Sequence, residues 1–270
     1  MTMTQYELNQ ELKSAAYTGD IETVRALVES GVPVNGRDDH GVTPLHAAAG
    51  GGHKEVAEFL IARGAKVDAA DNKYGQQPLH HAALEGKTEV AELLIGCGAK
   101  IDAPDRNANQ PLHLAAYHAR KKMVEFLVAK GAPVDAVNNE GMQPLHMAAR
   151  GGFHDAWKVV KPLLAGGARV DAGDGEGNQP LHLAAQFHHR KMMSLLLRHG
   201  ADPGAVNNCG QTPREFCQSV EIYNDYMYIK AFLKRAERGS RERKALAAFR
   251  AQRRQFAALR PAAPMLWVKP

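Results

Sequence analysis

Aromatic residues are scarce in this chain of 270 residues, where Phe, Trp and Tyr together make up only 6%. A core with so few large rings must be built mainly from Ala, Leu and Val, which favours small helices packed closely together. Cysteine is rarer still, and Cys97, Cys209 and Cys217 form no CxxC pair. Three widely spaced cysteines provide neither a disulfide framework nor a zinc motif, so we expect free thiols in a reducing compartment.

Long apolar runs are also missing from the chain. No stretch of about 18 apolar residues occurs, so we expect no transmembrane helix. The first residues, MTMTQYELNQ, do not combine a basic start with an apolar stretch, so we expect no secretory signal. These observations favour a cytoplasmic location and leave secretion by a non-classical route open.

Charge is distributed unevenly along the sequence. Residues 230–260 contain eleven Lys or Arg and two Glu, a local net charge of +9, and Lys269 adds one more positive charge. Because the whole chain has a net charge of +5, residues 1–229 must carry −5. The chain therefore joins a mildly acidic body to a strongly basic C-terminal tail, and a basic tail attracts anionic partners.

A proline-containing motif recurs along the acidic body. Its copies read TPLHAAA, QPLHHAA, QPLHLAA, QPLHMAA, QPLHLAA and a degenerate TPREFC, with prolines at Pro44, Pro78, Pro111, Pro144, Pro180 and Pro213. A glycine that precedes a small residue recurs in phase, and its first copy at Gly31 lies upstream of the first proline motif. A period close to 33 residues predicts stacked units, because no such unit can bury its apolar face alone.

Each repeat contains the signals of two helices. Proline is tolerated in a first helical turn, and Thr43 can cap that helix. The segment that follows is amphipathic, as Val56, Phe59 and Leu60 show, and a glycine after it can close the second helix. In the first repeat we expect helices over residues 10–17 and 21–29.

This pattern resembles the ankyrin repeat, which consists of a turn, TPLHxAA, a second helix and GAxVN. The resemblance covers roughly residues 8–235 and implies an all-α solenoid of about seven helix-turn-helix repeats, followed by a C-terminal basic helix. We expect an ankyrin-repeat domain at residues 1–238 and a basic tail at residues 239–270. The repeats are placed at residues 8–38, 39–71, 72–105, 106–138, 139–174, 175–207 and 208–238.

Several positions depart from the family pattern. Four of the five clear motifs begin with Gln, which is a poor N-cap, so amide contacts are expected to replace the hydroxyl contacts of Thr. Ala108 stands where the other turns have glycine. The fifth repeat carries three extra residues near Trp157 to Pro162, and Pro162 is expected to kink or restart its second helix. The insertion is either a functional loop or tolerated drift on the outer face.

Histidine is common, with 13 copies, but it does not indicate a metal site. Five histidines occupy the same motif position, and the resemblance implies that they form hydrogen bonds within and between repeats: His46, His80, His113, His146 and His182. Neighbouring repeats stack roughly 10 Å apart, too far for two such residues to share an ion. We also find no phosphate loop, nucleophile elbow or HExxH motif, and expect no enzyme activity, cofactor, metal or small-molecule substrate.

Binding residues should lie at positions that vary between repeats. The resemblance implies that the turn tips and the ends of the first helices face a concave groove. We predict that the following residues bind a protein: Tyr74, Leu84, Glu85, Arg106, Tyr117, His118, Glu140, Arg150, Gln186 and Phe187. Leu84, Tyr117 and Phe187 could serve as apolar anchors. Leu84 and Phe187 could instead fold back onto the neighbouring repeat.

The basic tail supports three interpretations. Ile229, Phe232 and Leu233 could cover the final repeat, and Gly239-Ser240 should form a break before a basic amphipathic helix at residues 242–260. That helix could be an extra cap, could bind an acidic protein or an anionic membrane surface, or could bind nucleic acid. The predicted basic residues of the tail are Arg241, which directly precedes this helix, and, within the helix, Arg243, Lys244, Arg250, Arg253, Arg254 and Arg260.

Two classes of function therefore remain open. In the first, the chain is a monomeric, non-catalytic adaptor or inhibitor that binds a protein partner through its groove and turn tips. In the second, it is a targeting protein, for example a bacterial secreted effector, whose tail docks on an anionic membrane surface or nucleic acid.

Overall fold

The computed structural model describes residues 4–216, 231–241, 243–244 and 247. This part of the chain consists of helices and turns without a strand, which confirms the all-α prediction. The elements are α1 (Gln5–Thr18), α2 (Ile21–Glu29), α3 (Pro44–Gly51), α4 (Lys54–Ala62), α5 (Pro78–Glu85), α6 (Thr88–Gly96), α7 (Pro111–Tyr117), α8 (Lys121–Ala129), α9 (Pro144–Arg150), the 3-10 helix η1 (Ala156–Val159), α10 (Val160–Ala165), α11 (Pro180–Gln186), α12 (Arg190–Arg198) and α13 (Pro213–Phe216).

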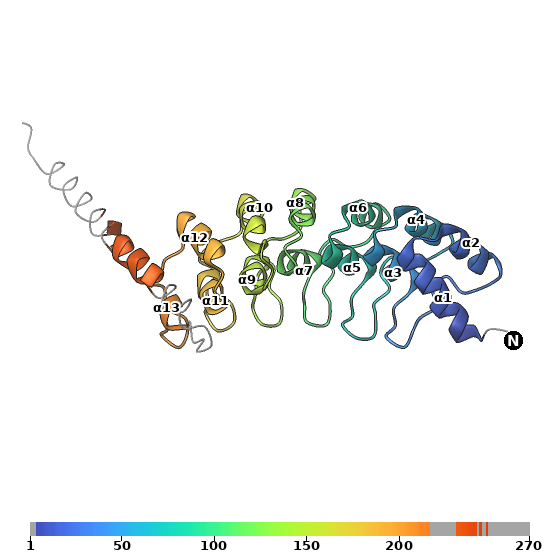
Figure 1. Ribbon diagram of the computed structural model, residues 1–270, viewed down its shortest axis with the longest axis horizontal. Helices are drawn as coiled ribbons and strands as arrows, with labels where there is room; N and C mark the ends of the chain where they lie inside the picture. Colours follow the sequence, from blue (N-terminus) through green and yellow to red (C-terminus); the bar gives the residue numbers. More distant parts are fainter. Residues whose placement is uncertain (1–3, 217–230, 242, 245–246, 248–270) are drawn as a thin grey trace, which may run out of the picture.

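The helices form an elongated stack of repeated pairs (Figure 1). The first helices of the repeats, from α3 to α11, lie in one row, and the second helices, from α4 to α12, lie in another row beside them. The turns that precede each first helix project from the stack on the side away from the second helices. This arrangement creates two different surfaces, one made by turns and first helices and one made by second helices.

Local sequence signals explain where the helices begin and end. Thr43 is the extended N-cap of α3 and Pro44 its first residue, which costs nothing because that position has no intrahelical hydrogen bond to lose. Gly52 ends α3 in the left-handed region, with φ 86°. Ala119 and His188 occupy the same place after α7 and α11 with φ 56° and 59°, although both have a side chain that disfavours this conformation.

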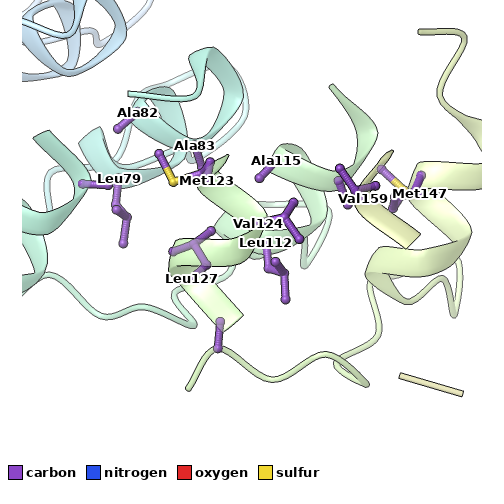
Figure 2. Packing of buried hydrophobic residues seen from close by; sticks show 14 of the residues in the cluster. Leu79, Ala82, Ala83, Leu112, Ala115, Met123, Val124, Leu127, Met147 and Val159 are labelled. Atoms are coloured by element: carbon purple, nitrogen blue, oxygen red, sulfur yellow. The ribbon is translucent and has the colours of Figure 1, made fainter. Parts of the chain in front are cut away.

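The core is continuous along the whole stack. Leu45, Leu79, Leu112, Leu145 and Leu181 hold the same motif position and are all fully buried. Figure 2 shows such residues together with the small side chains that let successive helices approach, among them Ala82, Ala83 and Ala115, and with residues of the second helices such as Val124 and Leu127. Each repeat therefore buries its apolar face against its neighbours.

The first helix is longer than the sequence pattern indicated. It begins at Gln5 rather than at residue 10, because Thr4 and Glu7 form a reciprocal capping box in front of it. The expected start was wrong because it followed apolar periodicity alone. The second helix, Ile21–Glu29, has the predicted bounds.

The insertion in the fifth repeat divides its second helix. The chain leaves α9 in an extended conformation at Gly151, passes through η1 and enters α10, which has only six residues where the other second helices have nine. Pro162 lies in the first turn of α10, so the expected restart of the helix near this proline is confirmed. A side chain at Gly151 would collide with the backbone oxygen of Tyr117.

One helix contains the end of the final repeat and the first residues of the predicted tail. Residues 231–241 are helical, Leu233 is fully buried and Phe232 packs against the core, so these two residues cover the repeat as expected. Ile229 lies outside the described residues. The expected break at Gly239-Ser240 is wrong, because both residues lie within the helix.

Contacts on both sides of this glycine hold the helix in place. Glu237 lies 3.4 Å from the Arg214 guanidinium, and Lys244 lies 2.6 Å from Asp202. The division into a domain of residues 1–238 and a separate tail stays a prediction. In the described part of the chain, no helix combines the length and the hydropathy needed to cross a bilayer.

Candidate protein-binding surface

The projecting turns are fixed by a repeated acceptor. The Oδ1 atom of Asp105 accepts from the backbone N–H groups of Asn107 and Asn109, both at 2.8 Å. Asn138 and Asp174 fill the same role in the next two turns. Because one short side chain holds two backbone groups, each turn has the same shape while the residues at its tip are free to vary.

Neighbouring turns are also joined to each other. The backbone N–H of Arg106 donates to the oxygen of Tyr74 at 2.8 Å, and the N–H of Asn139 donates to Asn107 at 2.9 Å. Equivalent bonds join Gly175 to Glu140 and continue to the last described turn. The turn tips therefore form a row with fixed spacing.

The five motif histidines hold successive repeats together, as the resemblance implied. In His113, Nδ1 accepts from the Gln110 backbone N–H at 3.2 Å, and Nε2 lies 3.1 Å from the oxygens of Met142 and Ala136. Since Nδ1 accepts, the ring proton must be on Nε2, which donates across to the next repeat. Burial lowers the pKa of His46 and His113 to about 4, so both rings are neutral at pH 7.

The glutamines contribute differently from what was expected. At Gln77, Gln110, Gln143 and Gln179 the backbone N–H donates to the motif histidine. Their side-chain Oε1 atoms are buried without a hydrogen-bond partner in the described part of the chain. In Thr43, by contrast, the hydroxyl lies 2.8 Å from His46 Nδ1. Each glutamine side chain nevertheless faces the backbone N–H of the motif histidine in the capping-box arrangement that Thr43 also adopts, so the difference lies at Nδ1, which the Thr43 hydroxyl contacts and the glutamine amide does not.

Four of the predicted binding residues meet in one hollow. Glu140, Arg150, Gln186 and Phe187 line an open space of about 750 Å³ between the turns and first helices of the fifth and sixth repeats. We call this space the groove hollow. Its lining also includes residues outside the predicted set, among them Met142, Asp174, Glu176, Leu183 and Phe216.

The groove hollow combines an apolar floor with an acidic rim. Phe187 is 43% exposed, which is high for a large apolar side chain, and Leu183 lies buried beside it. The rim has the carboxylates of Glu140, Asp174 and Glu176. Arg150 is its basic side chain and binds Glu140 at 2.7 Å, so the rim retains a net charge of −2.

Tyr117 and His118 belong to a second group of side chains, which does not line the groove hollow. Their rings contact each other at 5.1 Å between centroids, and Phe153 lies 6.1 Å from Tyr117 and 5.1 Å from His118. Burial lowers the pKa of His118. Phe153, which is 43% exposed, was not among the predicted residues, and its signal was its place two residues after Gly151, between α9 and the insertion.

The remaining predicted groove residues are separate from these groups. Leu84 is half-buried, and Arg120 donates to its backbone oxygen at 2.8 Å while pairing with Glu85 at 3.1 Å. Tyr74 is exposed at a turn tip, with Lys73 Nζ 4.7 Å from its ring centroid. Arg106 reaches back to the Asn72 oxygen of the preceding turn.

Only part of the predicted basic site can be placed. Arg241 and Arg243 are exposed on the C-terminal helix, and Lys244 is paired with Asp202. The other four predicted tail residues, Arg250, Arg253, Arg254 and Arg260, lie outside the described residues. Within the described ranges, no three His, Cys, Asp or Glu side chains come together in a way that could hold a metal.

A family model for ankyrin repeats in three copies matches this chain at residues 12–105, 70–138, 87–168 and 112–207. These matches cover most of the sequence. The chain belongs to the ankyrin-repeat family. The solved ankyrin-repeat domain of human ASB11 agrees with this result, with a TM-score of 0.67 and 27% identity over 81% of this chain and 96% of that domain.

Curated relatives match over shorter segments. Mouse protein phosphatase 1 regulatory subunit 27 is 41% identical over 61 residues, which are 23% of this chain and 40% of that protein. Acyl-CoA-binding domain-containing protein 1 of Arabidopsis thaliana is 42% identical over 64 residues, 22% of this chain and 19% of that protein. The chain thus spans two fifths or less of the length of these curated relatives.

Proposed function

We propose that this ankyrin-repeat chain is a monomeric adaptor or inhibitor without catalytic function, which binds a protein partner through its turn tips and groove hollow. The observation that carries this proposal is the meeting of Glu140, Arg150, Gln186 and Phe187 in one open space. Apolar anchors in partly enclosed sites dominate the energy of protein interfaces. Ankyrin repeats are typically interaction scaffolds, and the relatives include a phosphatase regulatory subunit.

The groove hollow also indicates what the partner should present. An exposed Phe187 needs an apolar side chain against it, and a rim with a net charge of −2 favours a basic neighbour. The proposed partner segment therefore carries an apolar residue next to Lys or Arg. We include a cytoplasmic location in the proposal, because Cys97 and Cys209 are free and exposed, as thiols in a reducing compartment are.

The proposal is tested by quantitative affinity capture, in which three baits are each incubated with an extract of the native source. The full chain, Phe187→Ala and Val137→Ala are compared, since Val137 is also an exposed apolar residue, at 56%, but lies outside the groove hollow. A partner should be enriched by the full chain and by Val137→Ala, and lost with Phe187→Ala. Equal enrichment by all three baits would place the interface elsewhere.

Docking through the tail is the alternative function, and a truncation separates it from groove binding. The chain should end after residue 247, because residues 231–241 and Lys244 already pack on the final repeat. Groove binding predicts that this shortened chain captures the same partner. Tail docking predicts instead that it loses attachment to anionic vesicles or nucleic acid while its repeats stay folded.

A further inference from the structure

The surface formed by the second helices contains an apolar groove that the proposed function does not use. It has a volume of about 710 Å³ and lies between α8 on one side and η1 with α10 on the other. Its apolar lining comes from Val128, Ala129, Trp157, Pro162, Ala165 and Leu195. We call it the outer groove, and it shares no residue with the groove hollow.

The insertion accounts for the outer groove. The other second helices pack against their neighbours over nine residues, whereas α10 has six and is preceded by the narrower turn of η1. Trp157, which η1 supplies, is only half-buried. Ala129, Ala165 and Pro162 are too small to fill the remaining space between the helices. The site is therefore specific to the repeat that departs from the regular length.

Positive charges surround this apolar surface. Lys121, Lys158 and Lys161 line the groove, and Lys191 Nζ lies 5.6 Å from the Trp157 ring centroid. The nearby carboxylates are Glu125, which pairs with Lys121 at 3.2 Å, and Asp155, which pairs with Lys158 at 2.7 Å.

Two of these lysines have no carboxylate partner. Lys161 and Lys191 form no ion pair in the described part of the chain. Residues 1–229 carry a net charge of −5, so a basic apolar groove on this body is unusual.

The apolar lining and the two lysines without a carboxylate partner together fit a ligand that is both apolar and anionic.

We propose that the outer groove binds an acidic amphipathic helix of a partner protein. The apolar face of such a helix would lie on Trp157, Pro162 and Leu195, and its carboxylates would pair with Lys161 and Lys191. The outer groove lies on the row of second helices, whereas the groove hollow lies among the turns and first helices. The inference therefore does not depend on the proposed function. It would let the chain hold two proteins at once.

Two other occupants fit the charges less well. Residues 248–270 of this chain contain five Lys or Arg and no acidic residue, so the lysines would repel the chain's own tail. A fatty acid has a single carboxylate, whereas the lysines come from α8, η1, α10 and α12 and lie on several sides of the groove. Several carboxylates in one peptide match this distribution.

The test uses the full chain with Trp267→Phe, which leaves Trp157 as the only tryptophan because the sequence has two. The probe is a labelled amphipathic peptide of roughly five turns, with Leu at helical spacing and Glu on the other positions. A matched peptide has Lys in place of every Glu, and palmitate tests the lipid occupant. Binding is measured by the fluorescence anisotropy of the label. A change in the fluorescence emission of Trp157 shows that the peptide binds at the outer groove.

Three variants connect binding to the groove. Lys161→Glu/Lys191→Glu reverses the unpaired charges, and Ala165→Leu fills the groove from an exposed position. Lys100→Glu is the charge control on an exposed residue outside the groove. If melting curves show that the Lys161→Glu/Lys191→Glu variant is unfolded, Lys161→Ala/Lys191→Ala is used in its place.

The proposal predicts saturable binding of the Glu peptide with a change in Trp157 emission. The dissociation constant should rise at least about tenfold in the charge and filling variants and stay unchanged in Lys100→Glu. The Lys peptide should not bind. Equal binding of both peptides, insensitivity to both groove variants, or binding of palmitate alone would each overturn the proposal.

Discussion

Acidification should destabilise the repeat stack through its motif histidines. The fold requires neutral His113, because Nδ1 accepts from Gln110 N–H and a proton there would face that donor. Burial lowers the pKa of His113 from 6.5 to about 4, so the unfolded chain binds the proton more tightly than the folded chain. The stabilisation is therefore complete above pH 6.5 and is lost as the pH falls toward 4.

The magnitude follows from these two values. Between neutral pH and pH 5, a pKa of 6.5 in the unfolded chain and about 4 in the fold corresponds to a loss of about 2 kcal/mol for His113. His46, with the same pKa, should contribute a similar loss. Burial also lowers the pKa of His80, His146 and His182. Acidification should therefore lower the free energy of unfolding through these residues as well.

Urea unfolding followed by far-UV circular dichroism can isolate the contribution of one ring. At pH 7, His113→Gln should lower the free energy of unfolding by about 1–3 kcal/mol, because Met142 and Ala136 lose their buried donor. At pH 5 this difference should shrink by about 2 kcal/mol, since glutamine does not bind the proton. His154→Gln is the control, because the His154 side chain is 85% exposed. An equal effect of His113→Gln at both pH values would refute the reasoning.

Four further outcomes follow from the same contacts. Gln110→Thr should raise the free energy of unfolding by about 1 kcal/mol, because it removes a buried unpaired oxygen and restores a hydroxyl at His113; unchanged urea midpoints would contradict this. Ala108→Gly should raise it by about 0.5–1 kcal/mol, since Ala108 has φ 58°, and a lower melting temperature would show that chain entropy dominates. Phe187→Ala should weaken partner binding by more than about 1 kcal/mol without unfolding the chain. Added zinc should leave the melting temperature nearly unchanged, and a large stabilisation would reveal a site that the motif histidines do not explain.

The regular part of the fold could be predicted because its signals are local. Pro44 and its counterparts mark helix starts, and the buried leucines of the motif recur with the repeat period. A repeated local signal specifies both the unit and its neighbour, so stacking follows without knowledge of long-range contacts. The hydrogen-bonding role of the motif histidines was implied by the resemblance to the ankyrin repeat and not by the repeat period itself.

The start of α1 was missed although its signal, the capping box of Thr4 and Glu7, is local, whereas the other differences depend on tertiary contacts. Gly239-Ser240 indicated a break, since glycine costs about 1 kcal/mol in a helix, but Leu233, Glu237 and Lys244 hold the helix on both sides of it. Phe153 joins Tyr117 across a gap of 36 positions that no periodicity reports. The outer groove follows from how the insertion changes the packing of η1 and α10 against α8 and α12, which the sequence spacing alone does not reveal.

Site-specific photocrosslinking tests the central claim most directly, namely that the groove hollow is where the partner binds. A photoreactive residue is placed at Gln186, which is exposed in the groove hollow, and in a second chain at Glu58, which is exposed on α4 among the second helices. The account predicts that the partner crosslinks at position 186, that Phe187→Ala abolishes this product, and that position 58 gives none. Crosslinking of the same partner at position 58, or at position 186 with Phe187→Ala present, would contradict it.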